Sequence, residues 1–469
     1  MFEKKVFKGK EKKESDFEQK LIDLRRVARV VAGGRRFSFR ATVVIGNRLG
    51  EVGIGTAKGA DTAAAIQKAA RMLEIGMDGI LDEKIPKVSW RQPTPWRIFA
   101  VAGALKAGVS PLKIYQKTGI DPFFLEKIKN IAEMEKSITS TKGIKSSEII
   151  KTAKQYGFSD RRLAMLTGSS EDKIRTLRQK LGIHPSVKQI DTLAAEYPAE
   201  TNYLYLTYNG EADDVKSDDG RKIIVLGSGP YRIGSSVEFD WCSVTCAQTV
   251  ARNGYDPIII NCNPETVSTD FDMAKRLYFE ELTTESVLAI YRKENPLGIV
   301  VSMGGQTPNN IVGDLANNNL KILGTSAASI DQAEDRNKFS SLCDQLGIAQ
   351  PKWAKLKNVT DAVNFATTIG FPTLVRPSYV LSGSAMNVAY NASDLKNYLK
   401  AASGISKKYP VVISKFHTNA KEIEIDAVAR DGRLLTYAIC EHIENAGVHS
   451  GDSTMVLPAQ KIYYQTEKQ

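Results

Sequence analysis

The sequence has little that would anchor the chain in a membrane or cross-link it. No apolar run approaches the roughly 18 residues of a membrane span, and no apolar stretch follows the Lys-rich N-terminus, as a signal peptide would require. The five cysteines include no Cys-x-x-Cys pair. Cys242 and Cys246, four apart in an expected helix, fit small buried side chains better than a zinc site. We therefore expect a cytoplasmic protein in a reducing compartment.

Positive charge is concentrated at one end of the chain. The 469 residues carry a net charge of +11, and 42% of them are hydrophobic, as in an ordinary globular protein of about three domains. Residues 1–77 hold 17 Lys/Arg and 9 Asp/Glu, a net +8, which leaves +3 for the other 392 residues. This excess indicates either one polyanion-binding module or an ordinary solvated charged face.

The first 77 residues predict a compact module with the order helix, three strands, helix. After a basic tail over 1–14, apolar spacing predicts an amphipathic helix capped by Ser15 or Asp16, from Phe17, Leu21, Leu24, Val27 and Ala28. Strands over 30–39, 41–46 and 52–55 follow, and then a helix from about Thr62. An Arg-rich glycine turn between strands lets backbone amides and guanidinium groups approach an RNA backbone closely.

Two motifs within this module, AGGRRFSF and GEVGIGTAKGAD, carry a family resemblance. Residues 15–72 resemble the N-terminal double-stranded-RNA-binding-type (dsRBD-like, α-β-β-β-α) domain of ribosomal small-subunit protein five. The resemblance implies contact with rRNA through six residues, Arg25, Arg26, Gly34, Arg35, Arg36 and Lys58. The second domain of that family does not follow.

An internal repeat marks the next region, between about residues 97 and 185. Gly108 to Gly119 and Gly157 to Gly168 are 12-residue spans offset by 49 residues. In each, a serine is expected to cap a short helix that Thr-Gly closes, with a further helix starting at Asp121-Pro122 or at Ser169-Ser170. A DNA-reading helix-turn-helix would need a one-sided basic stripe, which is lacking, so we favour a structural helical domain.

Alternating strands and helices characterise the third region. The apolar runs Lys222–Leu226, Pro257–Asn261 and Leu297–Val301 read as parallel strands, whereas after about residue 335 longer strands indicate mixed α+β structure. The turn Gly227 to Gly234 resembles a dinucleotide fingerprint, but its glycine spacing differs. The second strand also ends at Asn261, where a ribose-binding acid would be expected. A tight glycine turn is therefore favoured over an NAD site.

A candidate phosphate site follows the strand that ends at Arg376. A fixed arginine followed by the Ser/Gly-rich run 377–386 offers a cation and backbone amides to a polyphosphate, although a surface hairpin with a chance arginine would look alike. Downstream, Lys415, His417 and Glu422 flank a strand, and residues 447–452 form a turn rich in hydrogen-bonding groups. His442 and His449 are weighed evenly between ordinary polar and functional roles.

From about Leu73 to Gln469 the chain resembles the large subunit of carbamoyl phosphate synthetase, over its oligomerisation domain and part of its second synthetase half. The motifs that carry this are GSGPYRIGSSVEFDWC, NCNPETVSTDFD, GGQTP, EDRNKF, LVRPSYVLSGSAMNV and EHIENAGVHSGDS. The resemblance implies an ATP-grasp fold, ATP-dependent phosphorylation of carbamate in arginine and pyrimidine biosynthesis, Mg²⁺ or Mn²⁺, a possible glutaminase small subunit as partner, and homo-oligomers.

The same resemblance implies site roles. Arg376 and Arg336 would hold the ATP phosphates, Glu422 the ribose, and Lys415 with His417 the adenine region. The nucleotide edge would be held by Gly447, Val448, His449 and Ser450. Ser384 stands where many bacterial relatives have an arginine, which we take as subtype variation.

Departures from that family indicate an incomplete enzyme, and the join between the two resemblances leads to a chimera hypothesis. The E-x-N-x-R metal-ligand strand, the first synthetase half except its last helix, and the regulatory domain are not found, so we expect an incomplete enzyme. Residues Ala65–Met72 suit both resemblances, as a join between two unrelated genes would. Alternatively, the chain is a ribosomal or other RNA-binding protein with a non-catalytic C-terminal region.

We thus predict a multidomain protein of α/β and α+β class. Its expected parts are a basic tail (1–14), a dsRBD-like RNA-binding domain (15–76), a helical oligomerisation-type domain (77–215), a Rossmann-like pre-ATP-grasp domain (216–335) and a truncated ATP-grasp domain (336–469).

Overall fold

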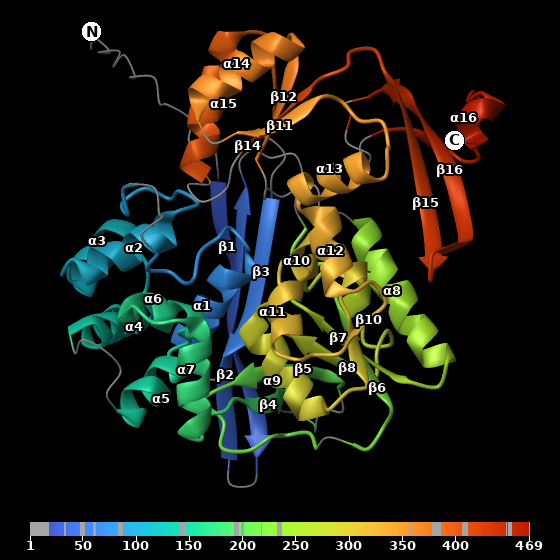
Figure 1. Cartoon of the computed structure of the whole chain (residues 1–469). Helices are drawn as coiled ribbons and strands as arrows, with labels where there is room; N and C mark the ends of the chain where they lie inside the picture. Colours follow the sequence, from blue (N-terminus) through green and yellow to red (C-terminus); the bar gives the residue numbers. More distant parts are fainter. Residues whose placement is uncertain are drawn as a thin grey trace, which may run out of the picture. The chain divides into compact units, whose positions relative to one another are not determined.

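The computed structural model divides into two compact units, residues 1–330 and 331–469 (Figure 1). No helix among the described residues is long and apolar enough to cross a membrane. For residues 18–59 the description covers the backbone. The described residues are 18–31, 34–46, 52–59, 62–82, 88–140, 146–191, 197, 201–216, 218–231, 237–356, 358–377, 386–405, 411–446, 448 and 453–468.

A three-stranded antiparallel sheet opens the first unit, in the order β1-β2-β3. Its strands are β1 (Glu18–Val31), β2 (Gly34–Gly46) and β3 (Val52–Gly59). The helix predicted over 17–28 is wrong, because β1 occupies that segment and pairs with β2 along nearly its whole length. Long-range strand pairing outweighs the local helical spacing, aided by the β-branched Val27, Val30 and Val31. The expected α-β-β-β-α order is therefore not confirmed.

Helix α1 (Thr62–Met72) confirms the helix expected from Thr62 and is buried over nine of its 11 residues. It contacts β2 and β3. Ala63, Ile66 and Ala70 enter the core of the helical region, whereas Ala65 and Ala69 pack in a second cluster with Cys262. Two separate cores thus share one helix.

The described residues between 88 and 180 form the six helices α2 to α7 after α1, and the repeat predicted among them is confirmed. Ser110 and Ser159 accept hydrogen bonds from the backbone N–H of Lys113 (3.3 Å) and Arg162 (3.0 Å), capping α3 and α6. Both helices close at a left-handed glycine, Gly119 or Gly168. The helices are α2 (Arg97–Lys106), α3 (Pro111–Thr118), α4 (Pro122–Ser140), α5 (Ser147–Gln155), α6 (Asp160–Thr167) and α7 (Glu171–Lys180).

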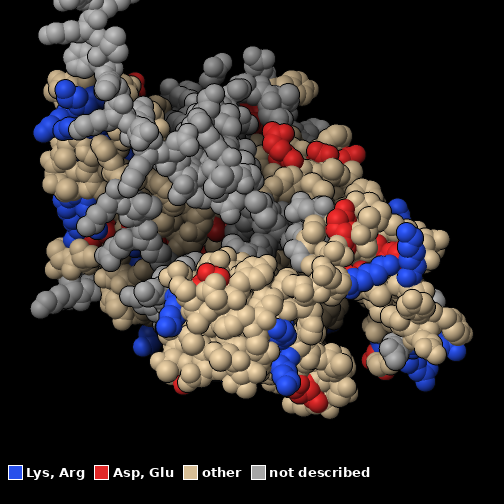
Figure 2. All heavy atoms as spheres, turned by 90° about the horizontal axis from the view of Figure 1, so that it is seen from above, with Lys and Arg blue, Asp and Glu red and all other residues tan. Residues whose placement is uncertain are grey.

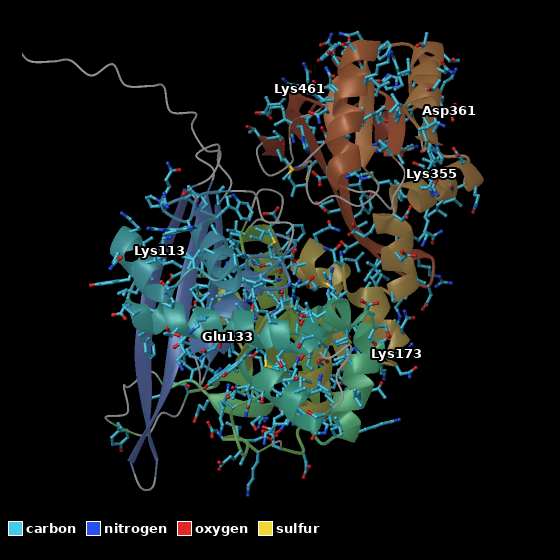
Figure 3. The ribbon with its side chains drawn as sticks, turned by 90° about the vertical axis from the view of Figure 1, so that its left-hand side faces the viewer. Lys113, Glu133, Lys173, Lys355, Asp361 and Lys461 are labelled. Carbon is cyan, nitrogen blue, oxygen red and sulfur yellow. The ribbon has the colours of Figure 1, made fainter. Side chains whose placement is uncertain are left out.

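Amphipathic spacing directs these helices toward a common core. Leu125, Ile128 and Ile131, three residues apart on α4, are buried. Charged residues such as Lys113, Glu133 and Lys173 are exposed on the outer surface (Figure 3). The core is therefore built from one face of each helix.

A seven-stranded sheet completes the first unit, in the order β10-β9-β6-β7-β8-β5-β4. All neighbouring pairs are parallel except β4 and β5, as expected for the three predicted parallel strands. The strands β4 and β5 lie within the segment 77–215 that we predict as helical. The strands are β4 (Ser186–Gln189), β5 (Tyr203–Thr207), β6 (Lys222–Leu226), β7 (Asp256–Asn261), β8 (Arg276–Phe279), β9 (Gly298–Val300) and β10 (Ile322–Leu323).

Helices and short turns connect these strands, and separate hydrophobic clusters form around the sheet. The connecting elements are α8 (Val237–Arg252), η1 (Val267–Thr269), α9 (Thr284–Glu294), η2 (Ser302–Gly304), α10 (Gln306–Asn309) and α11 (Val312–Asn317), with α12 (Ala327–Glu334) at the boundary between the units.

The glycine turn after β6 is a tight packing turn, as the sequence favoured. Asn261 accepts hydrogen bonds at Oδ1 from the backbone N–H of Gly229 (3.0 Å) and donates from Nδ2 to Ser268 (2.9 Å). A Cβ atom at Gly227 would come within 2.5 Å of the Asn261 side chain. The side chain that stands in place of a ribose-binding acid is therefore committed to the fold.

The cysteines on α8 are less buried than expected. Cys242 is exposed and Cys246 is half-buried, whereas Cys262, Cys343 and Cys440 are buried. The helix directs Asp240, Ser243, Val244 and Ala247 inward instead. The prediction of a buried side chain is therefore wrong for Cys242, whereas Cys246 packs half-buried against a hydrophobic cluster.

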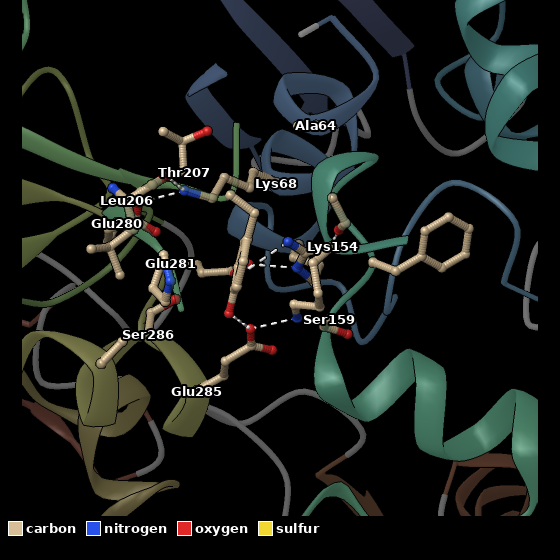
Figure 4. A pocket seen from close by; sticks show the side chains of 16 residues that line it. Ala64, Lys68, Lys154, Ser159, Leu206, Thr207, Glu280, Glu281, Glu285 and Ser286 are labelled. Carbon is tan, nitrogen blue, oxygen red and sulfur yellow. Dashed lines mark hydrogen bonds and ion pairs between the residues drawn. The ribbon is translucent and has the colours of Figure 1, made fainter. Parts of the chain in front are cut away.

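Ion pairs are buried between the helical region and the seven-stranded sheet (Figure 4). Lys154 on α5 contacts Asp160 (3.0 Å) and Glu285 on α9 (2.5 Å). Arg178 contacts Asp160 (2.8 Å), and the Tyr208 hydroxyl donates to Glu285 (2.9 Å). Nearby, α1 contributes the pairs Lys68 with Glu280 and Arg71 with Glu281 (2.6 Å). Each of these cations has a carboxylate partner.

The second unit combines a four-stranded antiparallel sheet, ordered β11-β14-β12-β13, with a three-stranded one, β15-β16-β17. This confirms the mixed α+β structure with long strands. Helices α14 and α15 contribute Ala362, Ala366, Leu395 and Leu399 to a core with Val375 and Ile413. The elements are α13 (Arg336–Gln345), β11 (Trp353–Leu356), α14 (Val359–Ile369), β12 (Thr373–Pro377), β13 (Asn387–Ala389), α15 (Ala392–Ile405), β14 (Val411–Lys415), β15 (Lys421–Arg430), β16 (Arg433–Asn445), β17 (Met455–Val456) and α16 (Tyr464–Lys468).

Candidate functional site

Arg376 is held on β12, inside the four-stranded sheet of the second unit. Its neighbour Val375 is fully buried in the core beneath α14 and α15, so strand alternation places Arg376 on the opposite face. The Nε atom of Arg376 is buried and has no hydrogen-bond partner among the described residues. A buried charged donor without an acceptor is costly, and an anion bound there would remove that cost.

A second guanidinium lies near Arg376. Arg336 begins α13, whose first turn is capped by Asp335, and its Nη1 lies 2.9 Å from the weak acceptor Sδ of Met386. Burial lowers the pKa of Arg376, and the positive charge of Arg336 lowers that pKa further. Within the described part of the unit, neither arginine forms an ion pair with a carboxylate, although burial lowers the pKa of Arg336 and the charge of Glu334 partly offsets this. Two neighbouring unpaired cations form a site suited to phosphate oxygens.

Lys415 does not direct its ammonium group toward this pair. It lies opposite Thr373 in the pairing of β14 with β12, while Arg376 lies opposite Val412, three residues along. Residues three apart in a strand occupy opposite faces. The Lys415 Nζ donates to the carbonyls of Gly370 and Phe371, both at 2.9 Å. Its side chain therefore stabilises the end of α14.

The remaining predicted residues lie along β15 and the segment after β16. His417 is exposed between β14 and β15, and Glu422 is half-buried near the start of β15. Val448 is 37% exposed and forms a bridge with Ala446. Gly447, His449 and Ser450 lie outside the described residues, as does Ser384. The nucleotide roles of all of these residues stay predictions.

Sequence reasoning missed the partners of a buried histidine. His442 on β16 is 3% exposed, and its Nε2 lies 3.1 Å from Oε2 of Glu424 on β15. Its Nδ1 lies 2.9 Å from Oγ of Ser453, two residues before β17. The three side chains connect the strands that flank residues 447–452. The long strands were visible in the sequence, but the register that joins Glu424 to His442 was not.

Metal ligands are not gathered around Arg376 in the described part of the second unit. No group of three or more His, Cys, Asp or Glu side chains able to hold a metal ion occurs among the described residues of the chain. The residues that the structure describes therefore do not fit a resident Mg²⁺ or Mn²⁺ site.

The sheet β1-β2-β3 aligns basic residues by its register. Arg25 lies opposite Arg40, and Arg40 lies opposite Lys58, which forms a row across the sheet. Arg29 and Arg36 lie opposite each other four residues farther along, on the same face. Arg26 and Arg35 belong to the other face, because they pair with Phe39 and Val30. The predicted RNA contacts are thus divided between the two faces.

The described surface of the whole chain shows a different charge distribution on the face in Figure 2. There, Lys and Arg side chains form small separate groups among Asp and Glu. The row on β1-β2-β3 is defined by strand register.

Four family models match successive parts of the chain. Three describe the carbamoyl phosphate synthase large chain: its oligomerisation domain at residues 56–182, its preATP-grasp domain at 219–332 and its ATP binding domain at 335–469. The fourth, the ribosomal protein S5 N-terminal domain, matches residues 17–72. The oligomerisation-domain match and the ribosomal-domain match share residues 56–72, which include α1. Both resemblances inferred from the motifs are therefore found, and they meet at this helix.

Known proteins share the larger part of the chain. It is 49% identical to "Multifunctional protein CAD" of Squalus acanthias over 91% of this chain and 19% of that protein. It is 46% identical to "Carbamoyl-phosphate synthase [ammonia], mitochondrial" of Rattus norvegicus over 89% of this chain and 28% of that one. The chain thus spans less than a third of the length of these relatives. Among solved structures, N5-carboxyaminoimidazole ribonucleotide synthetase from Thermus thermophilus aligns with a TM-score of 0.41 and 18% identity, over 52% of this chain and 60% of that one.

Proposed function

We propose that residues 331–469 bind ATP, with the phosphates held by Arg376 and Arg336, and that this unit is the ATP-binding part of an enzyme that phosphorylates carbamate. The observation that carries the proposal is the buried, unpartnered Nε of Arg376 beside a second unpaired guanidinium. The match of residues 335–469 to an ATP binding domain, and the names of the relatives, support the choice of ATP and carbamate.

Phosphate oxygens would supply the hydrogen-bond acceptors and the negative charge that the two arginines lack. They accept hydrogen bonds from several N–H groups at once, and their negative charge cancels the repulsion between the guanidinium groups. Glu422 would hold the ribose, and His417 the adenine region. Lys415 would only border the adenine region, because its ammonium group is engaged by two carbonyls and its backbone N–H donates to the carbonyl of Lys352 (2.9 Å). Gly447, Val448, His449 and Ser450 would border the nucleotide.

Nucleotide binding to the full chain tests this proposal. In titration calorimetry, Arg376→Ala is expected to weaken ATP binding by about tenfold or more, because a hydrogen bond to a charged group contributes about 1.5–3 kcal/mol. Arg430→Ala is the matched control, since it removes the same charge from a side chain that is 81% exposed. Equal affinities of the two variants would reject the site. Carbamate-dependent ADP formation tests the reaction separately.

A second function is favoured by the basic row on β1-β2-β3, namely binding of structured RNA. Arg25, Arg40 and Lys58 are aligned across neighbouring strands, and a row of cations suits the phosphates of an RNA backbone. Filter binding of a structured RNA to the full chain over a salt titration tests it. A steep salt dependence that weakens in Arg40→Glu is expected, and no salt dependence would exclude this function.

A further inference from the structure

A cavity with basic side chains at half of its lining positions lies between α7 and α9 in the first unit. Its volume is about 400 Å³, within the range of small-molecule sites. Its basic residues come from three segments, namely Arg175 and Arg178 on α7, His184 after it, and Arg292 and Lys293 on α9. Glu285 is the acidic residue that lines it.

Carboxylates neutralise only part of this charge. Arg178 is bound by Asp160, and Lys293 is paired with Asp213. Glu285 is already engaged by Lys154, by Tyr208 and by the backbone N–H of Asp160. Arg292 is exposed and forms no ion pair among the described residues. The cavity therefore keeps an excess of positive charge.

Arg175 has a buried guanidinium nitrogen without a hydrogen-bond acceptor among the described residues. The residue is only 5% exposed. It is paired with Asp172 and donates from Nη2 to Asn318 (2.9 Å), but its Nη1 is buried without a partner among the described residues. This nitrogen belongs to a side chain that lines the cavity, so a bound anion could accept its hydrogen bond.

Electrostatic repulsion among the basic side chains supports an excess of positive charge in the cavity. Although the Arg292 side chain is exposed, partial desolvation of its guanidinium lowers its pKa, and the positive charges of Arg175 and Arg178 lower that pKa further. Burial also lowers the pKa of His184, with added repulsion from Arg178, Lys293 and Arg292. An anion placed among these groups would relieve the repulsion.

We propose that this cavity binds a small phosphorylated metabolite, with the phosphate group between Arg175 and Arg292. The volume exceeds what a single phosphate fills. His184, Pro185 and Lys293 also line an adjoining cavity of about 480 Å³, which offers space for the organic part of the ligand. The site belongs to the first unit and is independent of the ATP site proposed in the second.

Calorimetric titrations of the full chain test this site, in an Arg376→Ala background that weakens the nucleotide site. The probes are ribose 5-phosphate, inorganic phosphate and unphosphorylated ribose. Binding of both phosphate-containing probes, tighter for ribose 5-phosphate, and no binding of ribose are expected. If neither phosphate-containing probe binds, the proposal is overturned.

A charge-reversal pair locates the binding. Arg292→Glu is expected to weaken ribose 5-phosphate binding by at least about tenfold, and Arg292→Ala by less. The control is Arg252→Glu at the exposed end of α8, which changes the charge equally and lies outside the cavity. Equal binding by the Arg252→Glu and Arg292→Glu variants would overturn the site.

Discussion

Two groups of buried cations in this protein differ in their partners. Lys154 and Arg178 in the first unit share the carboxylates of Asp160 and Glu285. Arg336 and Arg376 in the second unit are also substantially buried, yet neither forms an ion pair among the described residues. Arg336 is attracted electrostatically by Glu334, whereas Arg376 is repelled by Arg336. Compensated cations join elements of the fold, whereas uncompensated cations weaken the fold and are suited to a ligand. Burial alone does not separate the two roles.

Removing a shared carboxylate should have the largest effect. Glu285→Ala leaves Lys154 and Arg178 with one acidic partner, and the loss of one member of a buried pair costs about 3–5 kcal/mol. Urea denaturation of the full chain, followed through the first unit, measures this loss. Glu133→Ala is the control, because its contact with Lys129 (3.8 Å) is solvent-exposed and contributes little to stability. Equal losses would contradict the distinction.

The second-largest effect is expected from low pH, which should reduce the stability that Glu285 gives through its pairs with Lys154 and Arg178. Burial alone would raise the pKa of Glu285, but Lys154 and Arg178 outweigh it and lower the pKa to about 2. A carboxylate with a lowered pKa stabilises the fold above its unfolded value and loses that contribution as the pH falls, here from about 5 to about 2. We expect a loss on the order of 2–3 kcal/mol, and a smaller pH dependence in Glu285→Gln. An unchanged slope in that variant would contradict the assignment.

Removing an unpaired buried cation should not destabilise the fold, in contrast to removing Glu285. Arg376→Met replaces an unpaired buried cation with an apolar side chain of similar length. We expect a free energy of unfolding that is unchanged or raised by up to about 1 kcal/mol, together with weaker ATP binding. Chemical denaturation of the full chain checks it. A loss of several kcal/mol would place Arg376 among the structural cations.

The smallest effects are expected on the three-stranded sheet. Arg25 shares its face with Arg40 and Lys58, whereas its neighbour Arg26 belongs to the opposite face. Arg25→Glu should therefore reduce the salt slope of RNA binding by about one unit, and Arg26→Glu by less. Filter binding at several salt concentrations compares the two variants. The reverse order would show that the other face carries the RNA.

Local features of the sequence predicted the structure well where neighbouring residues determine it. Ser110 and Gly119 bound α3 because a side-chain cap and a left-handed glycine act within one turn. The strand Lys222–Leu226 follows from a short apolar run. By contrast, the apolar spacing of residues 17–28 predicts a helix where the structure has β1. That prediction fails because the strand depends on pairing with β2 and not on its own residues alone.

The candidate site was only partly predictable for the same reason. Arg376 stands out because a strand and a Ser/Gly-rich run surround it in the sequence. The faces that separate Arg376 from Lys415 depend on the register of β12 with β14. Glu285 lies 131 residues from Lys154, so only the fold could reveal that pair.

The burial of α1 has a consequence for how such a chain can change. An α-helix turns by about 100° per residue, so inserting one residue in its first turn would rotate every later side chain by that angle. The helix could then keep Lys68 and Arg71 on Glu280 and Glu281, and its alanines in their two cores, only if the preceding sheet β1-β2-β3 turned by the same angle. An exchange of the segment before this helix can succeed only when it preserves helical phase, which restricts viable joins to a few offsets.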